Sequence, residues 1–200
     1  MTLWYLMRAL GFSALVVLSA ATALGAASTH GNLTAAGLDR RVVRQLLHRS
    51  TAVVGLVLLV LHLVCAVIDT YVPVPLGGVL LPFTAAYRVV AMAIGTMALY
   101  AFVLTAVSGI TRGALAALPG TDRAWRAVHA SAYVGWALAM LHGFFGGSDT
   151  RKPWAIALYA ACTVAVGAAL LLRLAVAPRR SLDQRGHRRL KLPRTTGALR

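Results

Sequence analysis

Four histidines interrupt two apolar stretches of this chain, and their types and spacing could support chemistry. His48 and His62 are fourteen positions apart, and His129 and His142 are thirteen positions apart. At the α-helical rise of about 1.5 Å per residue, each pair spans about 20 Å. Ionisable side chains are rare within membrane segments and mark functional sites there. A single such histidine could equally make a helix-to-helix hydrogen bond, so the functional interpretation depends on all four.

The two histidine pairs predict two levels of imidazoles. If the two segments are parallel helices, His48 and His129 lie near one membrane face, and His62 and His142 lie near the other. Neutral imidazole is a common axial ligand of haem iron. Two imidazoles per level suit two six-coordinate b-type haems stacked across a bilayer, with these four histidines as the axial ligands.

The two spacings differ in helical phase. Fourteen positions leave an offset of about 40°, so His48 and His62 share a helix face, whereas thirteen leave about 140°. His129 and His142 therefore need a tilted or distorted helix to face the same way. Either a tilt of the helix or a local distortion near Gly135 must reconcile the two spacings.

The elements that would position these residues are transmembrane helices. The chain is 59% hydrophobic and 12% charged, with a mean hydropathy of +0.74. A segment of about 20 apolar residues crosses a hydrocarbon layer of about 30 Å. Five stretches of about this length lack Asp, Glu, Lys and Arg: Leu10–Leu38, Ser50–Ile68, Val89–Thr111, Ala127–Ser148 and Pro153–Leu172. They also lack the polar stripe of a soluble amphipathic helix. The predicted fold is an all-α, polytopic membrane bundle with five transmembrane helices.

The expected organisation is a haem-binding transmembrane domain at residues 1–176 followed by a basic, disordered cytoplasmic tail at 177–200. The five helices are expected at residues 3–27, 41–70, 87–109, 122–145 and 153–175. The connection Tyr71–Arg88 contains three prolines and two glycines. It cannot form one continuous helix, and we expect an external loop along the membrane interface.

The distribution of the +15 net charge predicts the orientation. Basic residues gather before the second helix, between the third and fourth helices, and in the tail. The positive-inside rule places these segments in the cytoplasm and the N-terminus outside, in a plasma membrane. The same distribution argues against a nucleic-acid partner. Arg8, an apolar run and "ATALGAAS" could form a cleaved signal peptide, but the predicted orientation favours a retained first helix.

Several residues near the histidines have two interpretations. Arg49 and Arg126 could pair with anionic haem propionates, or could only orient the helices. Arg44 and Arg123 also flank the level of His48 and His129. Arg88 is available near the level of His62 and His142. Small residues such as Gly55 and Gly135 could admit a flat macrocycle or close helix packing, of which packing is favoured. Cys65 and Cys162 are expected to be buried packing residues.

The two histidine segments resemble the haem helices of the ferric reductase-like transmembrane domain family. "LLHRSTAVVGLVLLVLHL" and "WRAVHASAYVGWALAMLHG" carry the likeness, through their histidine spacings of fourteen and thirteen, Leu-His-Arg and Trp-Arg-x-x-His. The family includes ferric reductases, the NADPH oxidase membrane core and the haem subunit of a methionine sulfoxide reductase system. The resemblance covers most of residues 3–175 and implies pairing of His48 with His129 and of His62 with His142.

The chain also departs from the family pattern. It carries no Gly-rich nucleotide loop after a strand, and the sequence predicts one helix fewer than the six-helix members have. The resemblance implies an oxidoreductase or electron-transfer subunit that depends on a flavin of a partner protein, another polypeptide or a membrane quinol as its electron donor. No catalytic residue is assigned.

Two other functions are open from the sequence. One is proton or metal-ion transport through intramembrane histidines, and the other is a non-catalytic membrane anchor. Transport paths usually include a carboxylate at depth, and Asp69 and Asp149 lie only at the ends of the expected helices.

Overall fold

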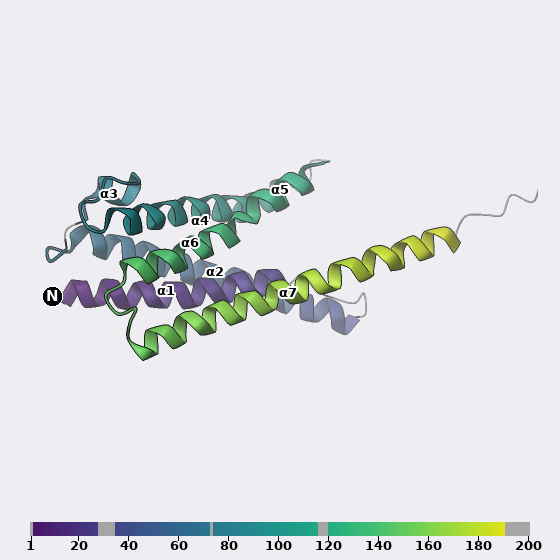
Figure 1. The fold of residues 1–200 in the computed structure, drawn as a ribbon. Coiled ribbons are helices and arrows are strands. Elements are labelled where there is room, and N and C mark those ends of the chain that lie inside the picture. The colour runs from purple at the N-terminus through teal and green to yellow at the C-terminus, as the bar shows by residue number, and fades with distance from the viewer. Residues whose placement is uncertain (1, 28–34, 73, 116–119, 191–200) are drawn as a thin grey trace, which may run out of the picture.

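The computed structural model describes residues 2–27, 35–72, 74–115 and 120–190. Within these ranges every regular element is a helix (Figure 1). The helices are α1 (Thr2–Ala27), α2 (Ala35–Ile68), α3 (Leu76–Leu80), α4 (Val89–Leu115), α5 (Thr121–His129), α6 (Ser131–Gly146) and α7 (Pro153–Leu190). The predicted all-α fold is confirmed for the described residues.

Four of the described helices are long and apolar enough to cross a membrane. They are Thr2–Ala27, Asp39–Ile68, Val89–Ala114 and Pro153–Ala175. Large apolar side chains on their outer surfaces are exposed, for example Ile110, Val164 and Leu171 at 83%, 69% and 69%. Such apolar surfaces are compatible with contact with membrane lipid.

The segment expected to be the fourth of five spans is broken. It forms α5 and α6, separated at Ala130, and neither piece reaches spanning length alone. Ala130 donates its N–H to the Arg126 carbonyl at 3.0 Å, and its own carbonyl accepts from the Tyr133 N–H at 3.1 Å. The second bond joins residues three apart, the tighter turn of a 3₁₀ helix. The distortion expected near Gly135 therefore lies at Ala130.

The predicted boundaries change at three further places. Helix α2 begins at Ala35 rather than at residue 41, and α7 continues to Leu190, into the segment expected to be a disordered tail. Residues 191–200 of that tail lie outside the described part of the chain. The predicted external loop contains the short helix α3, which is held to α4 by a bond from the Thr96 hydroxyl to the Val79 carbonyl at 2.9 Å.

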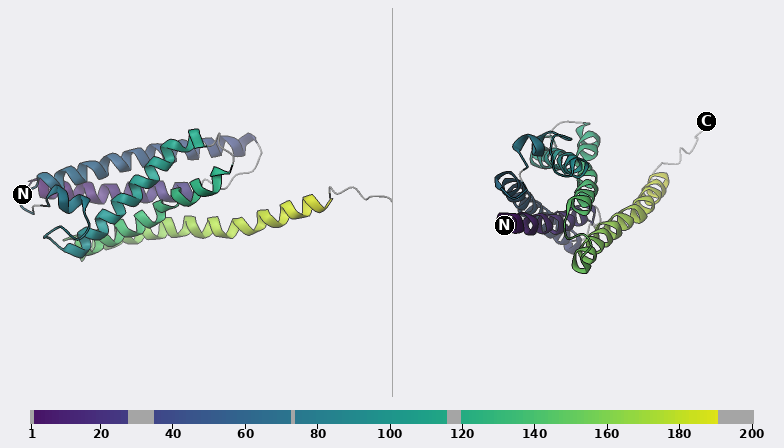
Figure 2. Two further views of the ribbon diagram at one scale, coloured as in Figure 1. Left: turned by 90° about the horizontal axis from the view of Figure 1, so that it is seen from above. Right: turned by 60° about the vertical axis from the view of Figure 1, so that its left-hand side comes forward.

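The helices form two hairpins that lie side by side. Helices α1 and α2 pack as one antiparallel pair, and α4 packs along α5 and α6 as the other (Figures 1 and 2). Helix α1 also contacts α6 and α7, so it lies at the centre of the bundle. The Trp136 indole N–H donates to the Ser19 hydroxyl at 2.9 Å and joins the two hairpins.

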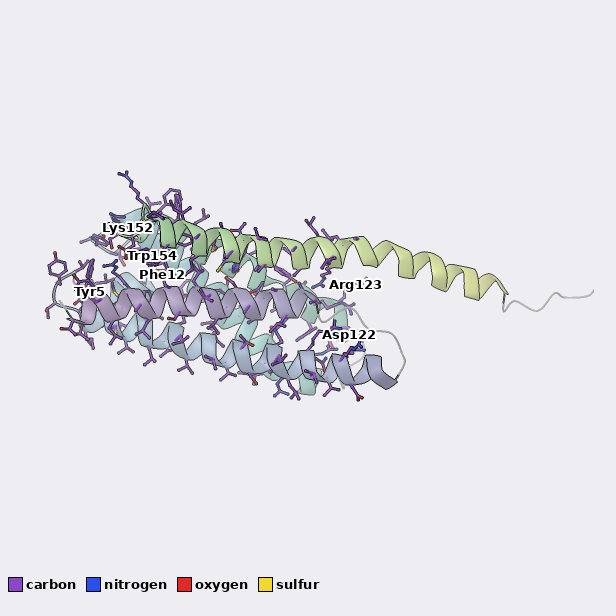
Figure 3. The ribbon with its side chains drawn as sticks, turned by 90° about the horizontal axis from the view of Figure 1, so that it is seen from below. Tyr5, Phe12, Asp122, Arg123, Lys152 and Trp154 are labelled. Atoms are coloured by element: carbon purple, nitrogen blue, oxygen red, sulfur yellow. The ribbon has the colours of Figure 1, made fainter. Side chains whose placement is uncertain are left out.

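The bundle has two distinct ends. Tyr5 and Lys152 lie at one end, whereas Asp122 and Arg123 lie at the other (Figure 3). Near the first end, Phe12 of α1 packs edge-on against Trp154 of α7, with ring centroids 4.9 Å apart. This contact holds the start of α7 against α1.

The small residues and the cysteines have packing roles. A Cβ at Gly55 would lie 2.7 Å from Leu18 Cδ2, and one at Gly135 would lie 3.1 Å from Ala101 Cβ. Both glycines therefore permit close helix contact, which is the interpretation favoured from the sequence. Cys65 and Cys162 are buried free thiols, as predicted.

Candidate functional site

The structure brings the four histidines together in two pairs, one towards each end of the bundle. The rings of His48, on α2, and His129, at the end of α5, have centroids 6.3 Å apart and planes at 76°. We call this pair the lower level. His62 of α2 and His142 of α6 both line one cavity of about 210 Å³ near the N-terminus of α1. We call this pair the upper level.

Three of the histidines donate a hydrogen bond to a backbone carbonyl of the neighbouring antiparallel helix. The acceptors are the carbonyl of Ala21 for His48 at 2.9 Å, that of Met7 for His62 at 2.8 Å and that of Ala91 for His142 at 2.8 Å. A carbonyl oxygen only accepts, so the ring Nδ1 must carry the proton. In the neutral imidazole, Nε2 then has a free lone pair, which is the form that binds a metal.

His129 reaches the same protonation state through a hydroxyl. Its Nδ1 lies 2.8 Å from Ser108 Oγ. The Ser108 hydroxyl donates its own proton to the Thr105 carbonyl at 2.7 Å. Because a hydroxyl has one proton to donate, Ser108 accepts from Nδ1–H of His129. Nε2 of His129 is therefore also left free.

A glycine lies beneath each histidine ring. A Cβ at Gly11 would lie 3.0 Å from His62 Cε1, and one at Gly25 would lie 3.0 Å from His48 Cε1. On α4, a Cβ at Gly95 would lie 2.6 Å from His142 Nδ1, and one at Gly109 would lie 3.7 Å from His129 Cε1. The glycines leave room for the imidazoles to lie against the backbones of α1 and α4.

These glycines have a fixed relation to the hydrogen-bond acceptors. Each lies four positions after the residue whose carbonyl accepts: Met7 before Gly11, Ala21 before Gly25, Ala91 before Gly95, and Thr105, through Ser108, before Gly109. A helical carbonyl points towards the N–H of the fourth residue along. Without a side chain at that residue, the carbonyl stays open to a second donor from the next helix.

The His48–His129 distance suits two ligands of one metal centre. Two imidazoles on opposite sides of one metal, with metal–nitrogen bonds of about 2.0 Å, have ring centroids about 6 Å apart. The observed 6.3 Å agrees with that geometry. Both Nδ1–H groups are already held by the protein, as is usual for histidines that bind metals.

Each level brings two histidines together. Among the described residues, no group of three or more His, Cys, Asp or Glu side chains could hold one. Structural and catalytic zinc sites need three or four protein ligands. A haem supplies four nitrogen ligands itself, so two histidines per iron suffice.

The arginines singled out from the sequence lie exposed near the histidines or bond to backbone carbonyls. Arg49 and Arg126 are exposed on α2 and α5, close in sequence to the lower-level histidines. Arg44 donates to the Ala27 carbonyl at 3.0 Å, which ties α2 to the end of α1. Arg88, expected near the upper level, donates to the Phe145 carbonyl at 2.7 Å.

Arg8 is a site residue that sequence reasoning missed. It lines the upper-level cavity with His62 and His142 and forms an ion pair with Asp149. Its guanidinium carbon lies 4.1 Å from the centroid of the Trp4 ring, and its buried Nε has no hydrogen-bond partner. The upper-level cavity is thus lined by a cation with one unused donor.

The four glycines were also missed, although the sequence carries a signal for them. Gly11 and Gly25 are fourteen positions apart, and so are Gly95 and Gly109. This spacing equals that of His48 and His62. A search for glycine pairs with the histidine spacing would have found both acceptor helices.

No family model, curated protein or solved structure matches the chain.

Proposed function

We propose that this protein is a transmembrane di-haem b-type cytochrome, ferric reductase-like, that moves single electrons across the plasma membrane. The observation that carries the proposal is the set of four imidazoles in two pairs, each with Nδ1–H held and Nε2 free. His48 and His129 would bind one iron, and His62 and His142 the other. Bound haem supplies one-electron redox chemistry between the ferric and ferrous states.

The chain's own residues would position the two haems and neutralise the charge of their propionates. Fourteen helical positions place the two levels about 20 Å apart. At the upper level, the unused Nε donor of Arg8 is chemically suited to a propionate acceptor. At the lower level, Arg49 and Arg126 are exposed and can turn towards a propionate. Because two histidines would hold each iron, bound haem would favour electron transfer over oxygen binding.

The topology and the electron donor are part of the same proposal. Helices α5 and α6 together form a fifth, kinked span, with the N-terminus of the chain outside and its C-terminus cytoplasmic. Helix α1 supplies acceptors for two of the four histidines, which supports a retained first helix. The donor is a partner flavoprotein or a membrane quinol, and the class of activity is oxidoreductase.

Absorbance of the purified full chain in detergent tests the proposal. We expect a Soret band, an α band that appears with dithionite, and about two haems per chain. His62→Ala should lose the upper haem and about half of the total, whereas His30→Ala, at a histidine with no assigned iron, should keep both. A folded, colourless wild-type protein would instead favour transport or anchoring. Retention of both haems in His62→Ala would contradict the ligand assignment.

A further inference from the structure

His129, at the lower level, has a hydrogen-bond acceptor and a stacked neighbour that the other three histidines do not share. At the lower level His129 donates to the hydroxyl of Ser108, while the other three histidines donate directly to backbone carbonyls. The Trp125 ring lies nearly parallel to the His129 ring, at 14° and with centroids 5.0 Å apart. Among the described residues, His129 is the one of the four histidines with such a stacked partner.

Trp125 and Ser108 form one hydrogen-bonded unit. The Trp125 indole N–H donates to the Ser108 carbonyl at 2.8 Å, while the Ser108 hydroxyl accepts from His129. Outside Trp125, the Arg112 guanidinium lies 4.1 Å from its ring centroid and is held by Asp122 at 2.8 Å. The orientation of His129 is therefore fixed on its edge by Ser108 and on its face by Trp125.

We propose that Ser108 and Trp125 are positioning residues that give the lower centre a reduction potential different from that of the upper centre. The inference rests on the proposed haem function. A backbone carbonyl is a stronger acceptor than a neutral hydroxyl, so it draws the Nδ1 proton more strongly and makes the ligand more basic. A more basic axial ligand stabilises ferric iron and lowers the potential. The Ser108 acceptor makes His129 less basic than a carbonyl-bonded histidine would be at the same place, and this raises the potential of the lower centre.

A redox titration of the purified full chain, followed in the α band and by electron paramagnetic resonance, tests this inference. The wild type should titrate as two components. Ser108→Ala removes the acceptor, lowers the basicity of His129 further and should move one component to higher potential while the other stays in place. Trp125→Phe keeps a stacked ring but loses the indole donor, and it should shift the same component less than Trp125→Ala.

Ser131→Ala is the matched control. Ser131 bonds to Thr105 Oγ1 at 2.8 Å and to the Ala101 carbonyl at 3.2 Å in the same helix interface, and neither bond is to an imidazole. Both components should keep their potentials in this variant. Equal shifts of both components in Ser108→Ala, or unchanged potentials in Ser108→Ala and Trp125→Ala, would overturn the inference while leaving the di-haem proposal standing. A wild type without haem would overturn both.

Discussion

The two hairpins carry their histidines differently: one does so on a single helix and the other on two short helices. In the first, an unbroken α2 carries two histidines at a spacing of fourteen, opposite two glycines of α1 at the same spacing. In the second, α4 again carries two glycines at this spacing, but His129 and His142 are thirteen positions apart and lie on two helices. The break at Ala130 changes the direction of one histidine relative to the other. The Ser108 hydroxyl then links His129 Nδ1 to the Thr105 carbonyl.

The acceptor helices, rather than the spacing of the histidines, therefore set the geometry of the site. Both α1 and α4 present a carbonyl and a glycine twice, at an interval of fourteen positions. The helices that carry the histidines adapt to that interval, one as a regular helix and the other through a tight turn. Substitutions in four places test how far the two hairpins, and the two ends they form, differ.

The largest effect is expected where a glycine of α4 is most crowded. In Gly95→Ala the new Cβ would lie 2.6 Å from His142 Nδ1, within the space of its hydrogen bond to Ala91. His142 must move, so about half of the haem should be lost from the purified protein, measured per chain by absorbance. Gly109→Ala is the control on the same helix, because its Cβ meets His129 Cε1 at an ordinary 3.7 Å. Equal haem contents in the two variants would contradict the role given to Gly95.

The next largest effect is expected on stability, when the ion pairs at the two ends of the bundle are broken one at a time. The side chains of Arg8 and Asp149 are 20% and 16% exposed, whereas those of Arg112 and Asp122 are 41% and 61% exposed. Breaking a half-buried pair leaves a charge that solvent compensates only in part and costs more than breaking an exposed pair, which contributes little. Arg8→Gln should therefore lower the thermal unfolding temperature in detergent far more than Arg112→Gln. Similar unfolding temperatures would show that solvent screens the Arg8–Asp149 pair as well as it screens the Arg112–Asp122 pair.

A smaller effect is expected at the joint between the hairpins. Ser19→Ala leaves the half-buried Trp136 indole N–H without its acceptor, which costs about 1 kcal/mol. Thr22→Ala is the matched change on α1, because the Thr22 hydroxyl bonds within its own helix, to the Leu18 carbonyl. Thermal unfolding should show the greater loss for Ser19→Ala. If Thr22→Ala destabilises as much, the bond between the hairpins contributes little.

The smallest effect is expected in the pH dependence of stability, at the end of the bundle that carries Asp122. The Arg112 guanidinium beside Asp122, through its hydrogen bond and its charge, holds the pKa of that carboxyl below its usual value. A lowered folded-state pKa contributes stability that is present above the unfolded pKa of about 3.9 and is lost as pH falls through the folded pKa. Unfolding temperatures measured as the pH is lowered through this range should therefore show a small acid loss that Asp122→Asn lacks. An identical acid loss in the variant would assign the effect to another group.

Much of the helical framework could be predicted from the sequence. Long uncharged stretches must form helices in an apolar environment, because every backbone N–H and C=O then bonds within its own segment. The turn signals between Tyr71 and Arg88 and around Gly120 correctly separated α2, α4 and α5. The break at Ala130 could not be foreseen, because Ala-Ser-Ala carries no helix-breaking residue. Ser131, next to the break, bonds to the Ala101 carbonyl of α4, a contact between residues far apart in the chain.

An all-helical, apolar chain with four histidines at two depths follows from the amino-acid order alone, because hydropathy and helical rise are local properties. Which atoms those histidines use depends on how the helices pack. The register of α1 against α2, and of α4 against α5 and α6, brings each Nδ1 to its acceptor and each ring over a glycine. It also places Arg8 in one cavity with His62 and His142. Those contacts join residues far apart in the chain, so helix packing rather than local sequence fixes them.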